Sequence, residues 1–413
     1  PSMVHESGLK QCTGEARYVD DLPAARSALV VHPVQSPHAR AKLLAIRSKR
    51  AQSLPGVWGV YTAADVPEIN DVGPVERDEP LLADGEVNYR GQVVAVVVGD
   101  NIDVCERAAA LVEVDYEPLR PILTIDDAIA NQNEMGTAHR MRQGDPEGAL
   151  ATATHRLKGR VETGGQEHFY LESQSALVVP EEDGRLTVYS STQHPTEVQQ
   201  LLARTLGGHW ADYVVKVPRV GGGFGGKETQ GAGFACLAGM AALRLGQPCK
   251  VWLNRDDDMV MTGKRHPCRT DYEVGFDDEG RITAFTADLW MDAGYARDLS
   301  GAVLDRAMFH LDNSCFIENL AFSGRLARTN KGSNTAFRGF GGPQGMVVIE
   351  TALDDIAEYL KMDPAEVRAV NFYGGKPGRD RTPYGQTFED DDNPLSELWH
   401  DLKASSDYGS RRQ

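Results

Sequence analysis

The order of apolar and polar residues predicts strands and helices in turn along the first part of the chain. SALVVHPVQS (27–36) predicts a strand, and QVVAVVVGD (92–100) is apolar enough for a strand that is buried on both faces. DNIDVCERAAALV (100–112) has its apolar residues at helical spacing. The stretch NEMGTAHRMRQGDPEG (133–148) is polar and follows neither period, so we expect it to be irregular and to hold a domain boundary.

This boundary predicts one domain over residues 1–130 and a larger one over 131–413. In the second, RTDYEVGFDDEGRITAFTADLWMD (269–292) is typical of two strands joined by a DDEG turn. TEVQQLLARTL (196–206) and PQGMVVIETALDDIAEYLKM (343–362) repeat apolar residues at three and four positions, which predicts amphipathic helices. The expected fold class is α+β, in two domains.

A glycine-rich loop, GGGFGGKE (221–228), follows a run of valines and precedes a small-residue helix expected over 232–245. Backbone N–H groups at such a place favour an anionic group. The phosphate-loop motif fits poorly, because Glu228 stands where that motif has Ser or Thr. The dinucleotide fingerprint also fits poorly, because the acidic residues that follow the next strand come late.

A second loop, SNTAFRGFGGPQG (333–345), repeats at 340–342 the Phe-Gly-Gly pattern found at 224–226. One interpretation is that both are tight turns whose phenylalanines fill the core. The other is a shared binding site, because Arg338 within the second loop is suited to an anionic, planar ligand. The pair suggests a bulky cofactor with an aromatic-stacked substrate beside it.

Composition limits the partners. The formal net charge of −17 over 413 residues argues against binding to nucleic acid. The sequence has neither a run of about eighteen apolar residues nor the apolar core of a signal peptide at PSMVHESGLKQ, so we expect a cytoplasmic protein without a membrane partner. Its six cysteines include no C-x-x-C pair, which argues against an iron–sulfur cluster or structural zinc on this chain.

Several motifs together resemble one family, the molybdenum-cofactor subunit of xanthine dehydrogenase and xanthine oxidase. They are GGGFGGKE, SNTAFRGFGGPQG, STQHPTEVQ (191–199), LDRAMFHLDN (304–313) and the opening HESGLKQCTGEARYVDDLP. The match runs from about residue 4 to the end. The resemblance implies an N-terminal α/β hammerhead-type domain followed by the first part of a larger, mixed α+β molybdopterin-binding domain.

The resemblance also implies a reaction. A molybdenum hydroxylase of this family hydroxylates a purine ring carbon, taking hypoxanthine or xanthine to urate with oxygen from water. Electrons then leave through iron–sulfur clusters to FAD on partner domains or subunits, and a homodimer of heteromeric units is expected. The final acceptor, nicotinamide or dioxygen, stays open.

Residues that match the family's cofactor site come from both loops and from the segment before the helix at 196–206. Gln193 matches the glutamine that hydrogen-bonds a molybdenum ligand, although a turn residue is the plainer interpretation. Phe224, flanked by Gly223 and Gly225, and Arg338 match positions that line the metal centre through backbone groups.

Three further positions match substrate contacts of the family. Glu228 matches a carboxylate that hydrogen-bonds the purine, Arg306 an arginine that stabilises developing negative charge, and Phe340 a ring that packs on the substrate. The plainer interpretations are a helix N-terminus for Glu228 and a solvated helix flank for Arg306. Aldehyde oxidases typically lack this charged pair. Carbon-monoxide dehydrogenases carry a cysteine in the loop matching FRGFGG, which has none here.

One family feature is not found. The glutamate that acts as base belongs to a later segment, and no Gly-Glu-Pro motif of that kind occurs in the 413 residues. We therefore expect this chain to be the N-terminal half of the subunit, either cut from a longer chain or one of two polypeptides that share the site. We expect it to be inactive alone. Two other hypotheses remain: an enzyme of the same fold acting on an aldehyde or another N-heterocycle, and a non-catalytic nucleotide-binding or assembly module.

Overall fold

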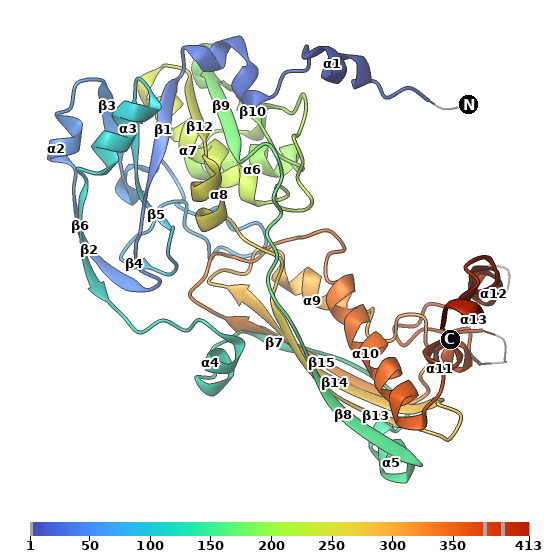
Figure 1. Ribbon diagram of the computed structural model, residues 1–413. Coiled ribbons are helices and arrows are strands. Elements are labelled where there is room, and N and C mark those ends of the chain that lie inside the picture. Colours follow the sequence, from blue (N-terminus) through green and yellow to red (C-terminus); the bar gives the residue numbers. More distant parts are fainter. Residues whose placement is uncertain (1–2, 375–377, 390–392, 413) are drawn as a thin grey trace.

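The computed structural model describes residues 3–374, 378–389 and 393–412 and contains two large β-sheets with helices packed on them (Figure 1). Among these residues, no helix combines the length and the apolarity needed to cross a membrane. The mixed α and β architecture predicted from the sequence is confirmed.

The first sheet has seven strands in the order β11-β10-β9-β12-β1-β5-β3. Its strands are β1 (Leu29–Gln35), β3 (Val57–Tyr61), β5 (Val93–Gly99), β9 (Ser175–Pro180), β10 (Leu186–Ser190), β11 (Tyr213–Lys216) and β12 (Cys249–Trp252). β1 pairs in parallel with β12, with Leu29 opposite Cys249. Strands from both of the expected domains therefore share one sheet. β5 is buried along its whole length, as predicted.

Helices cover both faces of this sheet. α6 (Pro195–Leu206) and α7 (Gln230–Leu245) enclose the main apolar core on one face. α2 (Lys49–Gln52) and α3 (Ile102–Ala109) enclose a smaller core on the other face, which includes Ala95 and Val97 of β5. A small sheet of β4 (Glu86–Val87), β2 (Ala41–Arg47) and β6 (Glu113–Pro118) flanks this region.

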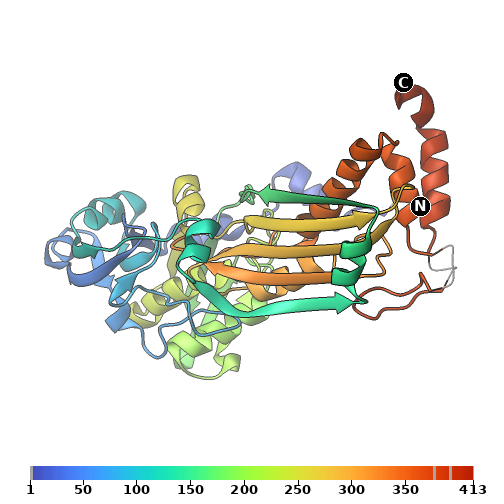
Figure 2. The same cartoon turned by 90° about the horizontal axis from the view of Figure 1, so that it is seen from below.

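The second sheet has five strands in the order β7-β15-β14-β13-β8 (Figure 2). They are β7 (Glu134–Gln143), β8 (His155–Thr163), β13 (Cys268–Phe276), β14 (Ile282–Gly294) and β15 (Leu320–Arg328). α9 (Ser300–Met308) and α10 (Gly342–Leu360) pack on one face, around a core that includes Leu304 and Ile349. α4 (Ile125–Ala130) and α5 (Pro146–Thr152) pack on the other face.

The remaining elements are short or peripheral. The α-helices are α1 (Gly8–Thr13), α8 (Arg255–Met261), α11 (Pro364–Asn371), α12 (Leu395–Ser405) and α13 (Tyr408–Arg412). The 3₁₀ turns are η1 (Val19–Asp21), η2 (Pro23–Arg26), η3 (Ala63–Asp65), η4 (Glu182–Gly184) and η5 (Trp210–Asp212).

The predicted hairpin and the predicted irregular stretch had different outcomes. β13 and β14 pair antiparallel around a turn in which the Gly280 N–H donates to the Asp277 carbonyl at 3.1 Å, which confirms the hairpin. The prediction that residues 133–148 are irregular was wrong, because this stretch forms β7 and the start of α5. β7 lies at the edge of the sheet, where ladder bonds to β15 hold the backbone while most of its polar side chains stay at least partly exposed.

Replacing Phe285 with alanine tests the core of the second sheet. Phe285 on β14 is fully buried and meets the Phe322 ring edge-on at 5.7 Å between centroids. We expect Phe285→Ala to lower the free energy of unfolding by about 3–5 kcal/mol, measured by urea unfolding. Val214→Ala, on the half-exposed flank of β11, should change it by no more than about 0.5 kcal/mol, and equal losses would contradict the assignment of the core.

Candidate functional site

The first glycine loop connects β11 to α7, as predicted, and contains a tight turn. The Gly226 N–H donates to the Gly223 carbonyl at 2.8 Å. Phe224 and Gly225 have φ values of 53° and 99°, left-handed at both central positions as in a type I′ turn. The Phe224 side chain is half exposed, so it does not fill the core.

The second glycine loop repeats this turn directly before α10. The Gly342 N–H donates to the Gly339 carbonyl at 2.9 Å, and Phe340 and Gly341 have φ values of 50° and 99°. Unlike Phe224, Phe340 is partly buried against the core of the second sheet. The shared Phe-Gly-Gly pattern thus encodes the same backbone turn twice.

The two loops touch through their backbones. The Arg338 N–H donates to the Phe224 carbonyl at 2.9 Å. A Cβ atom on Gly225 would lie 2.6 Å from the Ala336 carbonyl oxygen, so a side chain at position 225 cannot be accommodated without displacing the second loop. The structure therefore brings together Phe224, Gly225 and Arg338, three of the residues predicted to hold a cofactor.

His168 packs against both loops beside their point of contact. It is buried, its Nε2 lies 2.7 Å from the Ala336 carbonyl oxygen, and a Cβ on Gly226 would lie 2.6 Å from its Cγ. Burial lowers the pKa of His168, so the ring is neutral and Nε2–H donates to Ala336. Sequence reasoning missed this residue, because an isolated histidine carries no pattern.

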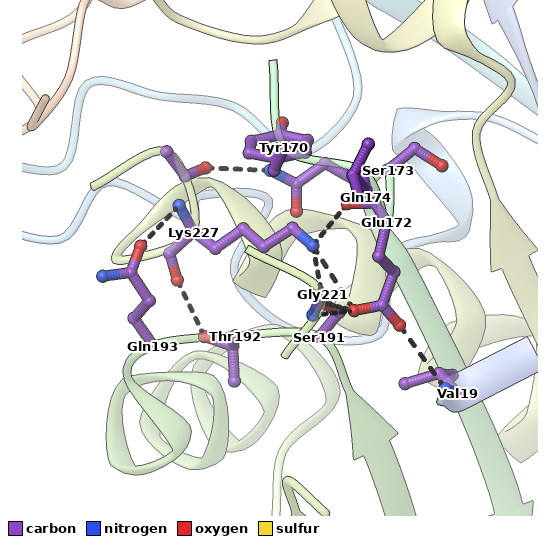
Figure 3. A network of polar contacts seen from close by, with 12 residues as sticks. Val19, Tyr170, Glu172, Ser173, Gln174, Ser191, Thr192, Gln193, Gly221 and Lys227 are labelled. Carbon is purple, nitrogen blue, oxygen red and sulfur yellow. Dashed lines mark hydrogen bonds and ion pairs between the residues drawn. The ribbon is translucent and has the colours of Figure 1, made fainter. Parts of the chain in front are cut away.

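Gln193 holds the first loop with its side-chain oxygen. Oε1 accepts a hydrogen bond from the Lys227 N–H at 3.3 Å (Figure 3). It also accepts one from the Gly225 N–H at 3.0 Å. A Cβ on Gly223 would collide with this oxygen. The two accepted bonds fix the orientation of the amide, and its NH₂ group has no hydrogen-bond partner within the described part of the chain. Gln193 therefore presents a donor to whatever lies beside the loop.

Glu228 lies among other acidic groups. Its N–H donates to the Gly225 carbonyl at 3.3 Å, which ties it to the first loop. Burial raises the pKa of the half-buried Glu228 carboxyl, and the nearby His194 lowers it. His194 Nδ1 also lies 3.3 Å from Glu197 Oε2. Burial, then Asp298 and Glu228, raise the pKa of Glu197 to about 7.

Arg306 lies on α9, next to the second loop. Gly341 and Gly345 approach the carbonyl oxygens of Val303 and Ala307 so closely that a Cβ on either glycine would collide. The exposed Arg306 guanidinium makes neither an ion pair nor a hydrogen bond among residues 3–374, 378–389 and 393–412. The structure does not bring Glu228 and Arg306 into contact: the first belongs to the loop before α7, the second to the helix beside the other loop.

These features fit a cofactor that carries hydrogen-bond acceptors. The glycines at 223 and 225 make room for the Gln193 side chain and for the Ala336 carbonyl, and Gln193 offers an oriented donor without a partner in the described structure. Arg338 and Phe224 border the same place.

Comparison with known proteins identifies the family. Residues 129–372 match the molybdopterin cofactor-binding domain, and residues 13–120 match the a/b hammerhead domain of aldehyde oxidase and xanthine dehydrogenase. The chain belongs to the xanthine dehydrogenase family of molybdenum hydroxylases. The predicted order, a hammerhead domain followed by part of the molybdopterin-binding domain, is thereby confirmed, whereas the exact limits 1–130 and 131–413 stay a prediction.

Relatives cover nearly all of the chain. It is 40% identical to the xanthine dehydrogenase of Dictyostelium discoideum over 98% of the chain and 30% of that protein. It is 40% identical to the xanthine dehydrogenase/oxidase of Gallus gallus over 100% of the chain and 30% of that protein. The chain thus spans about 30% of the length of these curated relatives.

Solved structures show the same fold. The aldehyde oxidoreductase of Desulfovibrio gigas superposes with a TM-score of 0.89 at 27% identity, covering 97% of this chain and 46% of that one. Quinoline 2-oxidoreductase of Pseudomonas putida 86 superposes with a TM-score of 0.88 at 25% identity, covering 100% of this chain and 55% of that one.

A pair of glycine variants tests the contact between the loops. Gly246→Ala places a methyl group in open space at φ 61°, so it should show only the left-handed backbone cost of about 1–2 kcal/mol. Gly225→Ala adds the collision with Ala336, so we expect a larger loss of stability and faster hydrogen exchange of the Arg338 amide. Equal effects of the two variants in urea unfolding and hydrogen exchange would contradict the contact.

Replacing Glu197 with glutamine tests the raised pKa of this carboxyl, which lies near Glu228. A folded-state pKa of about 7, above the ordinary 4.5, means that this carboxyl favours folding most below pH 4.5 and loses that contribution as the pH rises to about 7. Glu197→Gln should flatten this fall and be more stable than the wild type above pH 7, measured by urea unfolding across the window. Glu182→Gln, at an exposed site, should keep the wild-type slope. If the free energy of unfolding of Glu197→Gln fell with pH as steeply as that of the wild type, the raised pKa of Glu197 would be contradicted.

Proposed function

We propose that this chain forms part of a molybdenum hydroxylase that hydroxylates a purine ring carbon, taking hypoxanthine or xanthine to urate with oxygen from water. The observation that carries the proposal is the pair of abutting glycine loops beside the oriented Gln193 amide, within a molybdopterin cofactor-binding domain. Relatives named xanthine dehydrogenase, at 40% identity, support a purine as the substrate class.

In this proposal, residues of both loops hold the molybdenum cofactor. Gln193 donates a hydrogen bond from its NH₂ group, and the backbones at Gly223, Phe224, Gly225 and Arg338 line the metal centre. When bound, the cofactor supplies the oxidising power for hydroxylation at the ring carbon. The contribution of the chain is to orient the cofactor by donors that the two abutting loops hold in place.

Three side chains act on the purine in this proposal. Glu228 hydrogen-bonds a ring nitrogen, and its raised pKa lets the same carboxyl accept or donate a proton. Arg306, whose guanidinium has no partner in the described structure, holds the carbonyl side and stabilises negative charge that develops during the attack. The Phe340 ring packs on the flat face of the substrate.

The proposed assembly includes further parts. The remainder of the molybdenum domain supplies the base, and iron–sulfur clusters with FAD on partner domains or subunits carry the electrons away, in a homodimer of heteromeric units. The coverage of about 30% of the curated relatives supports such additional parts. The cytoplasmic location expected from the sequence stays a prediction.

A second candidate is oxidation of an aldehyde or another N-heterocycle. The superposition on the aldehyde oxidoreductase of Desulfovibrio gigas, at a TM-score of 0.89, and on quinoline 2-oxidoreductase, at 0.88, favours keeping it. An aldehyde offers no ring nitrogen to Glu228, so oxidation of an aldehyde assigns Glu228 no role in turnover.

Molybdenum content and variant kinetics test both candidates. We expect molybdenum, measured by elemental mass spectrometry, near one atom per chain in the assembled enzyme. Arg306→Met should lower kcat/KM for xanthine by about 100-fold to 1,000-fold, the usual cost of removing one donor to a developing charge, and Glu228→Gln should lower it too. Arg185→Met, at an exposed site directly before β10, serves as the control and should keep wild-type kinetics.

The outcomes separate the hypotheses. Oxidation of an aldehyde or another N-heterocycle, but not of xanthine, by the wild-type assembly would favour the second candidate. Unchanged kcat/KM for xanthine in both variants would contradict the roles proposed for Glu228 and Arg306. Absence of molybdenum from a folded, complete assembly would contradict both candidates and favour a non-catalytic module.

A further inference from the structure

Lys227, the residue directly after the first glycine loop, has a fully buried side chain. Its ammonium donates to the Glu172 carbonyl at 2.6 Å and to Ser191 Oγ at 2.7 Å, and it lies 3.6 Å from Glu172 Oε2 (Figure 3). The Tyr170 ring covers it, with the centroid 4.5 Å from Nζ. Two hydrogen bonds, one ion pair and one aromatic neighbour fix the position of the ammonium.

The backbone of the same residue holds Gln193. The Lys227 N–H donates to Gln193 Oε1 at 3.3 Å, and the Lys227 carbonyl accepts from the Gln193 N–H at 2.7 Å and from Thr192 Oγ1 at 3.1 Å. Because side chain and backbone belong to one residue, movement of the ammonium also moves the peptide that orients the Gln193 amide.

Glu172 holds the other end of the loop. Its Oε2 accepts from the Gly221 N–H at 2.7 Å and from Ser191 Oγ at 2.6 Å, and its own N–H donates to the Gly221 carbonyl at 3.1 Å. The ion pair between Lys227 and Glu172 therefore joins the first residue of the loop to the residue after its last glycine.

We propose that Lys227 is a positioning residue for the molybdenum cofactor: its buried ion pair with Glu172 closes the first glycine loop and thereby orients the Gln193 amide. The inference rests on the proposed function. Taking two charges out of water is costly, so such a pair adds little stability compared with apolar residues of the same size. Its effect is on geometry: it holds the ends of a loop that consists mostly of glycine, whose backbone is otherwise the most mobile of all.

Lys227→Met in the assembled enzyme tests this role, because methionine has a similar length and no charge. We expect about 10-fold to 100-fold weaker retention of molybdopterin, the usual effect of removing a residue that orients a ligand, measured as oxidised pterin fluorescence per chain after gel filtration. Peptides covering 221–228 should also exchange amide hydrogen faster than in the wild type.

Two further variants separate positioning from general stability. Val188 lies on β10 in the main apolar core of the seven-stranded sheet. Val188→Ala should lower the melting temperature, while pterin retention and amide hydrogen exchange at 221–228 stay at wild-type values. The double variant Lys227→Met/Glu172→Gln removes both buried charges, so its melting temperature should recover toward the wild type while pterin retention stays low.

Wild-type pterin retention in Lys227→Met would overturn the inference and leave the proposed function intact. The same holds if Val188→Ala, at an equal loss of melting temperature, loses as much pterin. Absence of molybdopterin from the wild-type assembly would overturn the proposed function and the inference together.

Discussion

The backbones of the two glycine loops touch each other directly, and much of the surrounding structure follows from that contact. Bringing two backbones together buries carbonyl oxygens that need donors. Different residues supply them: His168 bonds the Ala336 carbonyl, Gln174 Nε2 bonds the Gly226 carbonyl at 2.9 Å, and Arg265 bonds the Arg338 carbonyl at 2.9 Å. These side chains thus satisfy the carbonyl oxygens that the contact between the loops buries.

The contact also joins the two layers of the molecule, which are the seven-stranded sheet and the five-stranded sheet, each with its helices. The first loop follows β11 and leads into α7, which packs on the seven-stranded sheet. The second leads into α10, which packs on the five-stranded sheet. The site therefore lies where rigid elements of both layers meet. A functional group placed by such elements is held more firmly than one on a free loop.

Local patterns predicted much of this arrangement. The β13–β14 hairpin, the buried β5, the helices α6 and α10 and both glycine loops follow from short-range signals of period and turn residues. The pairing of Leu29 with Cys249 had no local signal, because tertiary packing between distant segments chooses a parallel pair. At the site, Gln193 was found inside a long motif. His168 and Glu172 were missed, because single polar residues in an irregular segment have no spacing to interpret.

The distribution of charge bears on the choice between a purine and an aldehyde. Glu228, with Glu197 and Asp298 near it, makes the side of the first loop acidic, whereas Arg306 stands beside the second loop without a carboxylate partner in the described structure. A purine presents N–H groups and ring nitrogens along one edge and carbonyl oxygens elsewhere, so it suits two sides of opposite character. An aldehyde presents one acceptor oxygen, which could satisfy the arginine and would leave the partly buried carboxyl without a partner. A partly buried carboxyl without a partner is costly, so the opposite charges on the two sides favour a purine over an aldehyde.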